Sequence, residues 1–405
     1  MSIPRELILK LPKTDLHLHL SGSIRLGTLI ELARDSGVKL PSYTESGLRE
    51  TVFTGQFECL EEYLECFSYT STVLRGREAL ERAAYELAMD NMAEGVRYIE
   101  VRFAPQLHVS SEMDIVEVFR GVNDGLGRAK SEFNRRPEIK SGSEPPFEYG
   151  LIACAMRFFN ESFSPYFRDF MRMHRYTEME RVWVLAALET AQAAVYARDR
   201  FGVPVVGFDL TGREAGYPAI DYKDAYNHVH RHFMYKTVHA GEAYGPESIF
   251  QAITELHADR IGHGASLLNP KAVTDPKIKD PEEYVRKLVQ FIADRRITIE
   301  ICLTSNQQTS PLFRDLSMHP FSEMFSNRLS VTICTDNRTV SNTTVTDELV
   351  KAVNGLDLSL PDLKNLIVYG FKRSFFPGNY AAKREYVRMC MEYFEKLASE
   401  KPKEV

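Results

Sequence analysis

Residues 11–23 read LPKTDLHLHLSGS, a short apolar run that contains two histidines, His17 and His19, separated by one leucine. The run is typical of a buried β-strand, in which residues two apart point to the same face. His17 and His19 therefore converge on one point, and Asp15 can approach it from slightly deeper. Two interpretations follow. Either both histidines are structural residues whose ring nitrogens have hydrogen-bond partners within the core, or they form half of a metal site, since neutral imidazole is the commonest metal ligand.

The 405-residue chain has the composition of an ordinary globular protein, with 44% hydrophobic and 26% charged residues. Its formal net charge of -6 gives no indication of a nucleic acid or a membrane surface as partner. The N-terminus has no apolar segment long enough for a signal peptide, and the six cysteines include no C-x-x-C pair. We therefore expect a cytoplasmic protein in a reducing compartment, and the composition leaves its oligomeric state open.

Short apolar runs alternate with longer helical patterns along the chain. Eight runs predict strands: TDLHLHL (14–20), VRYIEVRFA (96–104), YGLIACAM (149–156), VPVVGFDL (203–210), YKTVHAG (235–241), RIGHG (260–264), ITIEICL (297–303) and SVTICTD (330–336). Most of these runs are continuously apolar, as parallel strands covered on both faces are, and amphipathic patterns at 78–95 and 282–296 predict helices between them. The alternation predicts an α/β fold, a (β/α)8 TIM barrel that we expect to span residues 1–405 as a single domain.

One polar stretch interrupts this pattern. SEFNRRPEIKSGSEPPFE (131–148) contains prolines, a glycine and many charges, a composition that predicts a surface loop. No internal repeat, low-complexity tract or second core is evident elsewhere in the sequence.

Polar residues follow several of the predicted strands at their carboxyl ends, where the active sites of such barrels are formed. They are His17 and His19 in the first strand, His239 and Glu242 in HAGE, His263 in GHG, and Asp336 and Asn337 in TDN. A single histidine or aspartate at a strand end is often structural, but this many at one rim of a barrel favours a functional site. Three histidines and one carboxylate suit a divalent ion such as zinc, with an open position for water.

The ordered set LPKTDLHLHLSGS, EVRFAP, HAGE, RIGHG and TDN resembles the adenosine deaminase family of the amidohydrolase superfamily, from Leu11 to about Phe376. The resemblance implies one zinc ion per chain, with His17, His19, His239 and Asp336 as its ligands. It implies three catalytic residues: Glu242 as proton donor, His263, and Asp336. It also implies contacts of a small purine nucleoside with His19, Ser21, Gly212 (in DLTGRE) and Asn337.

The chemistry of hydrolytic deamination at purine C6 makes these residue types intelligible. A zinc ion can lower the pKa of a bound water from 15.7 to about 7, and we expect His263 and Asp336 to accept its proton and orient the attack. Glu242 has to be protonated beside N1, which requires a raised pKa in a dry pocket. The chain lacks the P-C-x-x-C motif of cytidine-deaminase-type enzymes, and VPVVGFDL lacks the lysine with which amidohydrolases bridge two metals.

A helical insertion after the first strand, within residues 22–95, is expected to cover the active site, as in the family that the chain resembles. Within it, Phe57, Leu60, Leu64 and Phe67 recur at helical spacing. The stripe that they form is either plain core or also the roof of the purine pocket, where it would exclude water.

Two positions depart from the usual pattern of that family and leave the substrate open. Ser21 stands where an aspartate usually accepts a bond from the ribose 5'-hydroxyl, and Asn337 stands where a second aspartate usually follows the metal ligand. An asparagine can still donate to purine N7, whereas Ser21 removes a charge that would repel an acidic 5' substituent, for which Arg25 is the nearest cation in sequence. Three interpretations remain: an adenosine and 2'-deoxyadenosine deaminase, a deaminase of a 5'-modified compound such as aminodeoxyfutalosine or an AMP derivative, and an inactive purine-binding relative.

Overall fold

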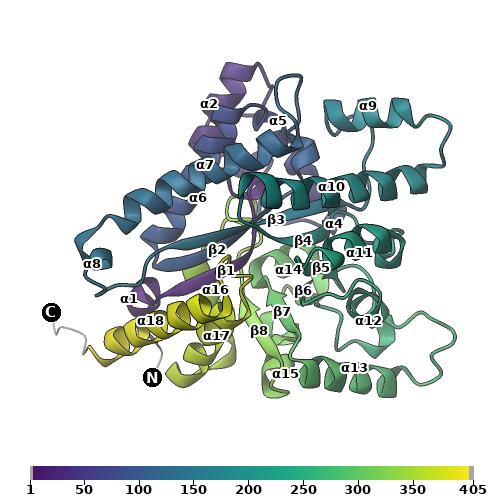
Figure 1. The fold of residues 1–405 in the computed structure, drawn as a ribbon. Helices are drawn as coiled ribbons and strands as arrows, with labels where there is room; N and C mark the ends of the chain where they lie inside the picture. The colour runs from purple at the N-terminus through teal and green to yellow at the C-terminus, as the bar shows by residue number, and fades with distance from the viewer. Residues whose placement is uncertain (1–2, 401–405) are drawn as a thin grey trace.

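The computed structural model describes residues 3–400, in which eight parallel strands pair in the order β1 to β8 (Figure 1). The strands are β1 (Lys13–His19), β2 (Val96–Phe103), β3 (Glu148–Met156), β4 (Val205–Thr211), β5 (Tyr235–Ala240), β6 (Arg260–His263), β7 (Thr298–Ile301) and β8 (Ser330–Ile333). A parallel bridge between Leu18 and Asp336 brings the end of β8 back to β1. The predicted (β/α)8 barrel and its eight strands are confirmed, with strand ends shifted by no more than about three residues.

Helices connect the strands and surround the barrel. Those of the described part are α1 (Arg5–Lys10), α2 (Leu26–Ser36), α3 (Glu45–Thr51), α4 (Leu60–Glu65), α5 (Phe67–Val73), α6 (Arg77–Ala93), α7 (Ile115–Asn134), α8 (Pro137–Lys140), α9 (Pro165–Met173), α10 (Met179–Phe201), α11 (Lys223–Arg231), α12 (Pro246–Thr254), α13 (Pro281–Arg295), α14 (Leu303–Thr309), α15 (Phe321–Ser326), α16 (Val345–Leu356), α17 (Leu360–Arg373) and α18 (Tyr380–Ser399). The helices predicted at 78–95 and 282–296 are α6 and α13. Asp280 starts α13 by accepting a hydrogen bond from the Glu283 N–H at 3.0 Å.

The surface loop predicted at 131–148 is wrong for about half of its length. Its first residues continue α7 to Asn134, and Pro137–Lys140 form the short helix α8. Proline is well suited to the first turn of a helix because its missing N–H has no intrahelical partner there, so Pro137 starts a helix instead of breaking one. The Asn134 side chain then bonds both backbone groups of Phe147, which ties α7 to the start of β3.

The interior of the barrel contains charges as well as apolar side chains. Five carboxylate or guanidinium side chains of β2, β4, β6 and β7 are no more than 1% exposed: Glu100, Arg102, Asp209, Arg260 and Glu300. Arg102 donates to Asp209 and to Glu300, both at 2.8 Å, and Arg260 donates to Glu300 at 2.6 Å and also pairs with Glu100. Buried charges are tolerated only when they are paired and hydrogen-bonded, so the network fixes the strands relative to one another.

The long connection between β1 and β2 carries helices α2 to α6. Figure 1 shows α2 and α5 gathered at one end of the barrel, and α6 packs along β2 and α7 as part of the outer ring. Residues of α4 and α5 lie over the carboxyl ends of the strands, as the expected helical insertion does. Across residues 3–400 the helices include none whose length and apolar character would let it span a bilayer.

Candidate active site

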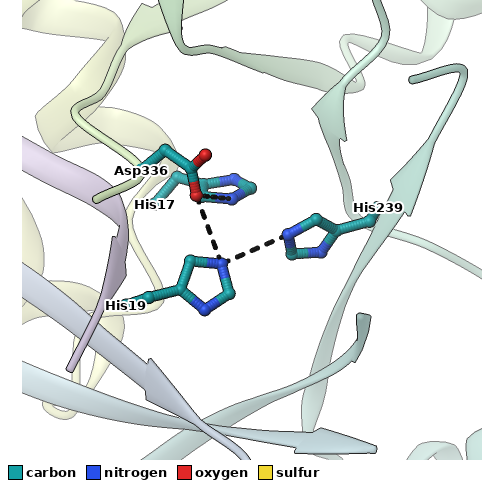
Figure 2. Close-up of side chains that lie close together, drawn as sticks. All are labelled: His17, His19, His239 and Asp336. Carbon is teal, nitrogen blue, oxygen red and sulfur yellow. Dashed lines mark hydrogen bonds and ion pairs between the residues drawn. The ribbon is translucent and has the colours of Figure 1, made fainter. Parts of the chain in front are cut away.

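Four side chains from three distant segments meet at the carboxyl ends of the strands (Figure 2). His17 and His19 come from β1, His239 from β5 and Asp336 from the turn after β8, and one ligand atom of each lies within 4.8 Å of all the others. His19 Nε2 lies 3.3 Å from His239 Nε2 and 3.4 Å from Asp336 Oδ1. The side chains point at one another, as the spacing of the two histidines in β1 predicts. Asp15 lies apart from this cluster, since its carboxylate accepts from Thr335.

Buried carboxylates orient two of the three imidazoles. His17 Nδ1 donates to Glu300 Oε2 at 2.8 Å, and His239 Nδ1 lies 3.0 Å from Asp209 Oδ2. A proton on Nδ1 leaves the Nε2 lone pair of each ring free for a metal ion. His17 Nε2 is buried, lies 3.5 Å from Asp336 Oδ1 and, within residues 3–400, forms no hydrogen bond. This nitrogen without a hydrogen bond and the His3Asp donor set fit a divalent ion such as zinc.

The two orienting carboxylates are held in their charged form. Burial by itself raises the pKa of Asp209 and Glu300, but the hydrogen-bonding and charged groups that face them outweigh it and hold both pKa values well below the usual range. The main groups are His239 and Arg102 at Asp209, and Arg102 and Arg260 at Glu300. Arg102 therefore serves both histidine–carboxylate pairs at once.

Glu242 and His263 lie next to the cluster and close to each other, with 3.8 Å between Glu242 Oε1 and His263 Nε2. Burial, followed by the charges of Asp336 and Glu214, raises the pKa of Glu242 well above its usual value. This is the protonation state that a proton donor beside purine N1 requires. His263 and Asp336 both adopt left-handed backbone conformations, with φ of 64° and 61°. Such conformations are costly for residues other than glycine and tend to occur at functional sites.

The turn that carries Glu242 is anchored by another carboxylate. Glu214 is 1% exposed and accepts hydrogen bonds from the backbone N–H groups of residues 241–244, at 2.7–3.0 Å, and from the Ser248 hydroxyl. Four parallel backbone donors satisfied by one carboxylate leave the turn little freedom. Glu214 thus positions Glu242 without reaching the pocket itself.

A chain of hydrogen bonds determines which nitrogen of His263 carries the proton. The Phe321 backbone N–H can only donate, and it donates to His319 Nδ1 at 3.1 Å, so the His319 proton is on Nε2. His319 Nε2 then donates to Asn306 Oδ1 at 3.2 Å, and the Asn306 amide donates to His263 Nδ1 at 3.1 Å. His263 is therefore neutral with its proton on Nε2, which agrees with burial lowering its pKa well below the usual value.

A cavity of about 460 Å³ opens above these groups. Leu60, Leu64 and Phe67 of α4 and α5 line it, whereas Phe57 packs edge-on against Tyr63 in the core. The apolar stripe is therefore mostly roof and partly core. Tyr63 also lines the cavity, which is of the size that small-molecule ligands occupy.

Every residue that the sequence suggests for substrate contact lines this cavity: His19, Ser21, Gly212 and Asn337. Gly212 has a φ of +94°, which a residue with a side chain rarely adopts. The Asn337 amide donates to the Tyr63 hydroxyl at 2.7 Å, and its Oδ1 sits where a Cβ on Gly22 would lie, only 1.7 Å away. Glycine at position 22 is therefore required by the side chain at 337.

Arg25, by contrast, takes no part in the site. Its guanidinium forms a bidentate pair with Asp90 on the protein surface and does not line the cavity. The suggestion that Arg25 binds an acidic 5' group is therefore wrong, because a surface carboxylate on α6 already holds this cation. The one Lys or Arg lining the cavity within residues 3–400 is Arg213, 3.2 Å from Glu61.

Comparison with known proteins agrees with this geometry. A family model described as adenosine deaminase matches residues 12–386. The chain belongs to the adenosine deaminase family. It is 32% identical to the adenosine deaminase of Mycobacteroides abscessus, over 91% of this chain and 92% of that protein. Adenosine deaminase 1 of Streptomyces coelicolor is 34% identical, over 91% and 84% of the two chains.

Solved structures show the same barrel. Adenine deaminase from Arthrobacter aurescens matches with a TM-score of 0.74 at 22% identity, over 95% of this chain and 99% of that one. The N6-methyl-AMP deaminase of Arabidopsis thaliana matches with a TM-score of 0.72 at 24% identity, over 96% and 98%. Together with the family assignment, these matches identify the chain as a hydrolytic deaminase of the TIM-barrel fold.

This member of the adenosine deaminase family also has residues that orient or anchor the site and to which the sequence motifs assign no role. They are the orienting carboxylates Asp209 and Glu300, their common partner Arg102, the anchor Glu214, the His319–Asn306 pair and Tyr63. The sequence contains a signal for Asp209 and Glu300, which are the single charges in the runs VPVVGFDL and ITIEICL, and a weaker one for Arg102, whose run VRYIEVRFA holds two further charges. A charge at a fully buried position is rarely tolerated without a partner.

Replacing the anchor tests its positioning role in this deaminase. Glu214→Gln presents an amide NH2 to backbone N–H donors and should destabilise the protein by about 1–3 kcal/mol. It should lower kcat more than it raises KM and leave the bound metal in place, because the altered turn carries Glu242 and no metal ligand.

Thermal unfolding, metal analysis and steady-state kinetics measure the three effects. Glu255→Gln, which removes only a surface pair with Lys223 at 2.7 Å, is the matched control and should change stability by no more than about 1 kcal/mol. Unchanged kcat in folded Glu214→Gln protein would show that the anchor does not position Glu242.

Proposed function

We propose that this member of the adenosine deaminase family is a zinc-dependent deaminase of adenosine and 2'-deoxyadenosine, yielding inosine or 2'-deoxyinosine and ammonia. His17, His19, His239 and Asp336 would hold one zinc ion. The observation that carries the proposal is the meeting of two features in one cavity. A metal-ligand cluster with an imidazole nitrogen that forms no hydrogen bond lies beside a buried glutamate whose pKa is raised. Deamination of a purine needs both a nucleophile at C6 and a proton donor at N1.

The roles of the protein groups follow from their contacts. When bound, zinc supplies hydroxide near neutral pH by lowering the pKa of water from 15.7 to about 7. Asp336 accepts the proton released from water, and Ser305 steadies its other oxygen at 2.6 Å. Glu242 donates a proton to N1 as C6 becomes tetrahedral. The amine then takes up the proton that Asp336 accepted and departs as ammonia, while the C6 hydroxyl returns a proton to Glu242.

His263 has a narrower role in this proposal than the sequence suggests. Because its proton is on Nε2, the atom that faces Glu242 and the pocket, His263 donates a hydrogen bond there and does not accept a proton. A donor aimed at developing negative charge on the attacking oxygen stabilises the transition state. Asp336 is then the proton acceptor, and His263 orients and stabilises the attacking oxygen.

The charges around the pocket favour a neutral 5' end. Within residues 3–400 the lining includes Arg213 as its one Lys or Arg, and Glu61 already neutralises it at 3.2 Å. Glu65 lies on the same helix as Glu61, so an acidic 5' group would meet carboxylates without a free cation. A plain ribose hydroxyl can hydrogen-bond Ser21 instead. AMP derivatives and aminodeoxyfutalosine are therefore the less favoured substrates, and family membership with a complete set of proton-transfer groups disfavours an inactive relative.

The proton-donor role predicts the behaviour of Glu242→Gln. The variant keeps the shape of the side chain but cannot deliver a proton, so kcat should fall by roughly 10²–10⁴-fold while zinc stays bound. Glu65→Gln, at the rim of the same cavity, is the matched control and should retain near-normal kcat. Turnover is followed by the loss of absorbance as the amine leaves, and near-normal turnover of Glu242→Gln would refute N1 protonation by this residue.

Asn306→Asp separates a donor from a base at position 263. The new carboxylate accepts a hydrogen bond from His263 Nδ1, so Nδ1 always carries a proton. The Nε2 atom that faces the pocket then has a lone pair when the ring is neutral, and a proton when the ring is an imidazolium. A donor role predicts that kcat falls on the alkaline side, as the ring loses its proton, by about 10²-fold. A base role predicts unchanged or higher kcat there. The measurement is the pH profile of kcat for wild type and variant between about pH 5.5 and 9, and alkaline activity at the wild-type level would contradict the donor role.

A substrate panel tests the 5' preference. The panel consists of adenosine, 2'-deoxyadenosine, adenosine monophosphate, methylthioadenosine and aminodeoxyfutalosine. The first two should have the highest kcat/KM. Ser21→Asp restores the residue usual in the family, so it should leave adenosine turnover intact or lower its KM, and it should damage any activity on acidic compounds. Ser162→Asp, elsewhere in the cavity lining, is the control. A kcat/KM for an acidic compound about tenfold above that for adenosine would contradict the preference.

A further inference from the structure

A second cavity lies at the opposite mouth of the barrel, away from the metal-ligand cluster. Its volume is about 570 Å³, and its walls come from the amino ends of β5, β6 and β7, the carboxyl ends of α13 and α17, and the first turns of α18. Seven lysines and arginines line it: Lys236 and Arg260 on the strands, Arg295 and Arg296 at the end of α13, Lys372 and Arg373 at the end of α17, and Lys383 on α18. The one acidic residue in the lining is Asp259.

Most of these cations have no counter-charge. Asp259 is 3.1 Å from Lys236, and Arg260 is held by Glu100 and Glu300 inside the barrel. Across residues 3–400, no carboxylate oxygen lies within 4.0 Å of the other five cations. Arg373 Nε is buried there without a hydrogen-bond partner. The whole chain carries an excess of acidic residues, with a net charge of -6, so this concentration of unpaired positive charge is local.

The cations repel one another in a partly desolvated space. Burial lowers the pKa of Lys383 to about 8; the charge of Glu100 opposes this shift, and the charges of Arg260 and Arg373 add to it. Burial and the charge of Arg296 also lower the pKa of Arg373. The helix dipoles of α13 and α17 favour cations at their carboxyl ends, which accounts for Arg295, Arg296, Lys372 and Arg373 on the rim. They do not account for Lys236 and Lys383, nor for a hollow between the charges.

An aromatic surface borders the same cavity. Tyr235 is 48% exposed and stacks on Phe375, with ring centroids 4.7 Å apart and an angle of 3° between the rings. The Arg260 guanidinium lies 3.5 Å from the centroid of the Phe375 ring. The stack is therefore held in place from inside the barrel, and the exposed part of Tyr235 is available to another planar group.

We propose that this cavity binds a polyphosphate chain carried by a nucleoside, that is, a nucleoside di- or triphosphate. The phosphates would contact Arg296, Lys372, Arg373 and Lys383, and the base would stack on Tyr235. Clustered lysines and arginines without acidic partners match the charge of a phosphate chain, and arginine matches its geometry through paired N–H donors. The site is separate from the purine pocket, so the proposal does not depend on the deaminase activity.

Calorimetric titration of the intact, zinc-loaded protein with cytidine triphosphate tests the proposal. A pyrimidine nucleotide is chosen because it lacks the purine ring that the active site is expected to bind. One molecule should bind per chain, and Arg296→Glu combined with Lys372→Glu should weaken binding by roughly tenfold or more, since like charges then face the phosphates. The control, Lys277→Glu with Lys279→Glu in the loop before α13, makes the same change in net charge and should bind as wild type does.

Inorganic tripolyphosphate in a parallel titration distinguishes the source of the phosphates. Tyr235→Ala should weaken the binding of cytidine triphosphate and leave tripolyphosphate unaffected. Equal affinities for the two compounds, with no effect of Tyr235→Ala, would overturn the nucleoside part and leave a site for free polyphosphate.

Two other results would overturn the site as a whole. They are the absence of saturable binding of either compound by wild type, and equal loss of binding in the charge-reversed variant and its control. Should the charge-reversed protein fail to fold, Arg296→Gln with Lys372→Gln provides the same comparison with a smaller change in charge.

Discussion

The active site depends on the ion pairs of one buried residue, Arg102, inside the barrel. Arg102 binds Asp209 and Glu300 at 2.8 Å each, and these carboxylates in turn accept from the Nδ1 atoms of His239 and His17. Without the guanidinium, two buried carboxylates would repel one another, and one of them would take up a proton. The imidazole beside it would then lose its acceptor and the preference for a proton on Nδ1. The direction in which two candidate metal ligands present their lone pairs is therefore decided by residues one layer below the cluster.

Above this layer, three side chains at the rim of the barrel are each held in place by a different contact. Asp336 is held by its backbone bridge to β1 and is forced into a left-handed conformation. Glu242 rides on a turn whose N–H groups all point at Glu214. His263 is fixed through a hydrogen-bond chain that begins at a backbone N–H. Rigid placement of this kind is what electrostatic catalysis requires, because the groups need not reorganise during the reaction.

The sequence alone predicts the fold and the meeting of the four candidate metal ligands, for a simple physical reason. Strand periodicity places His17 and His19 on one face, and parallel strands in a barrel bring His239 and Asp336 to the same rim. The sequence does not reveal the orienting role of a residue such as Glu300, because that role depends on which residues lie opposite it across the barrel. The direction of Arg25 was likewise beyond a one-dimensional argument, since Asp90 lies 65 residues away in the chain. The loop predicted at 131–148 was partly wrong because Pro137 begins a helix there.

Binding of one metal ion by His17, His19, His239 and Asp336 can be measured in a crystal structure of zinc-reconstituted protein, with anomalous scattering recorded at the zinc edge. We expect one peak per chain, about 2.0–2.2 Å from Nε2 of each of the three histidines and from a carboxylate oxygen of Asp336. A peak located elsewhere, or no peak between these four side chains after reconstitution, would contradict it.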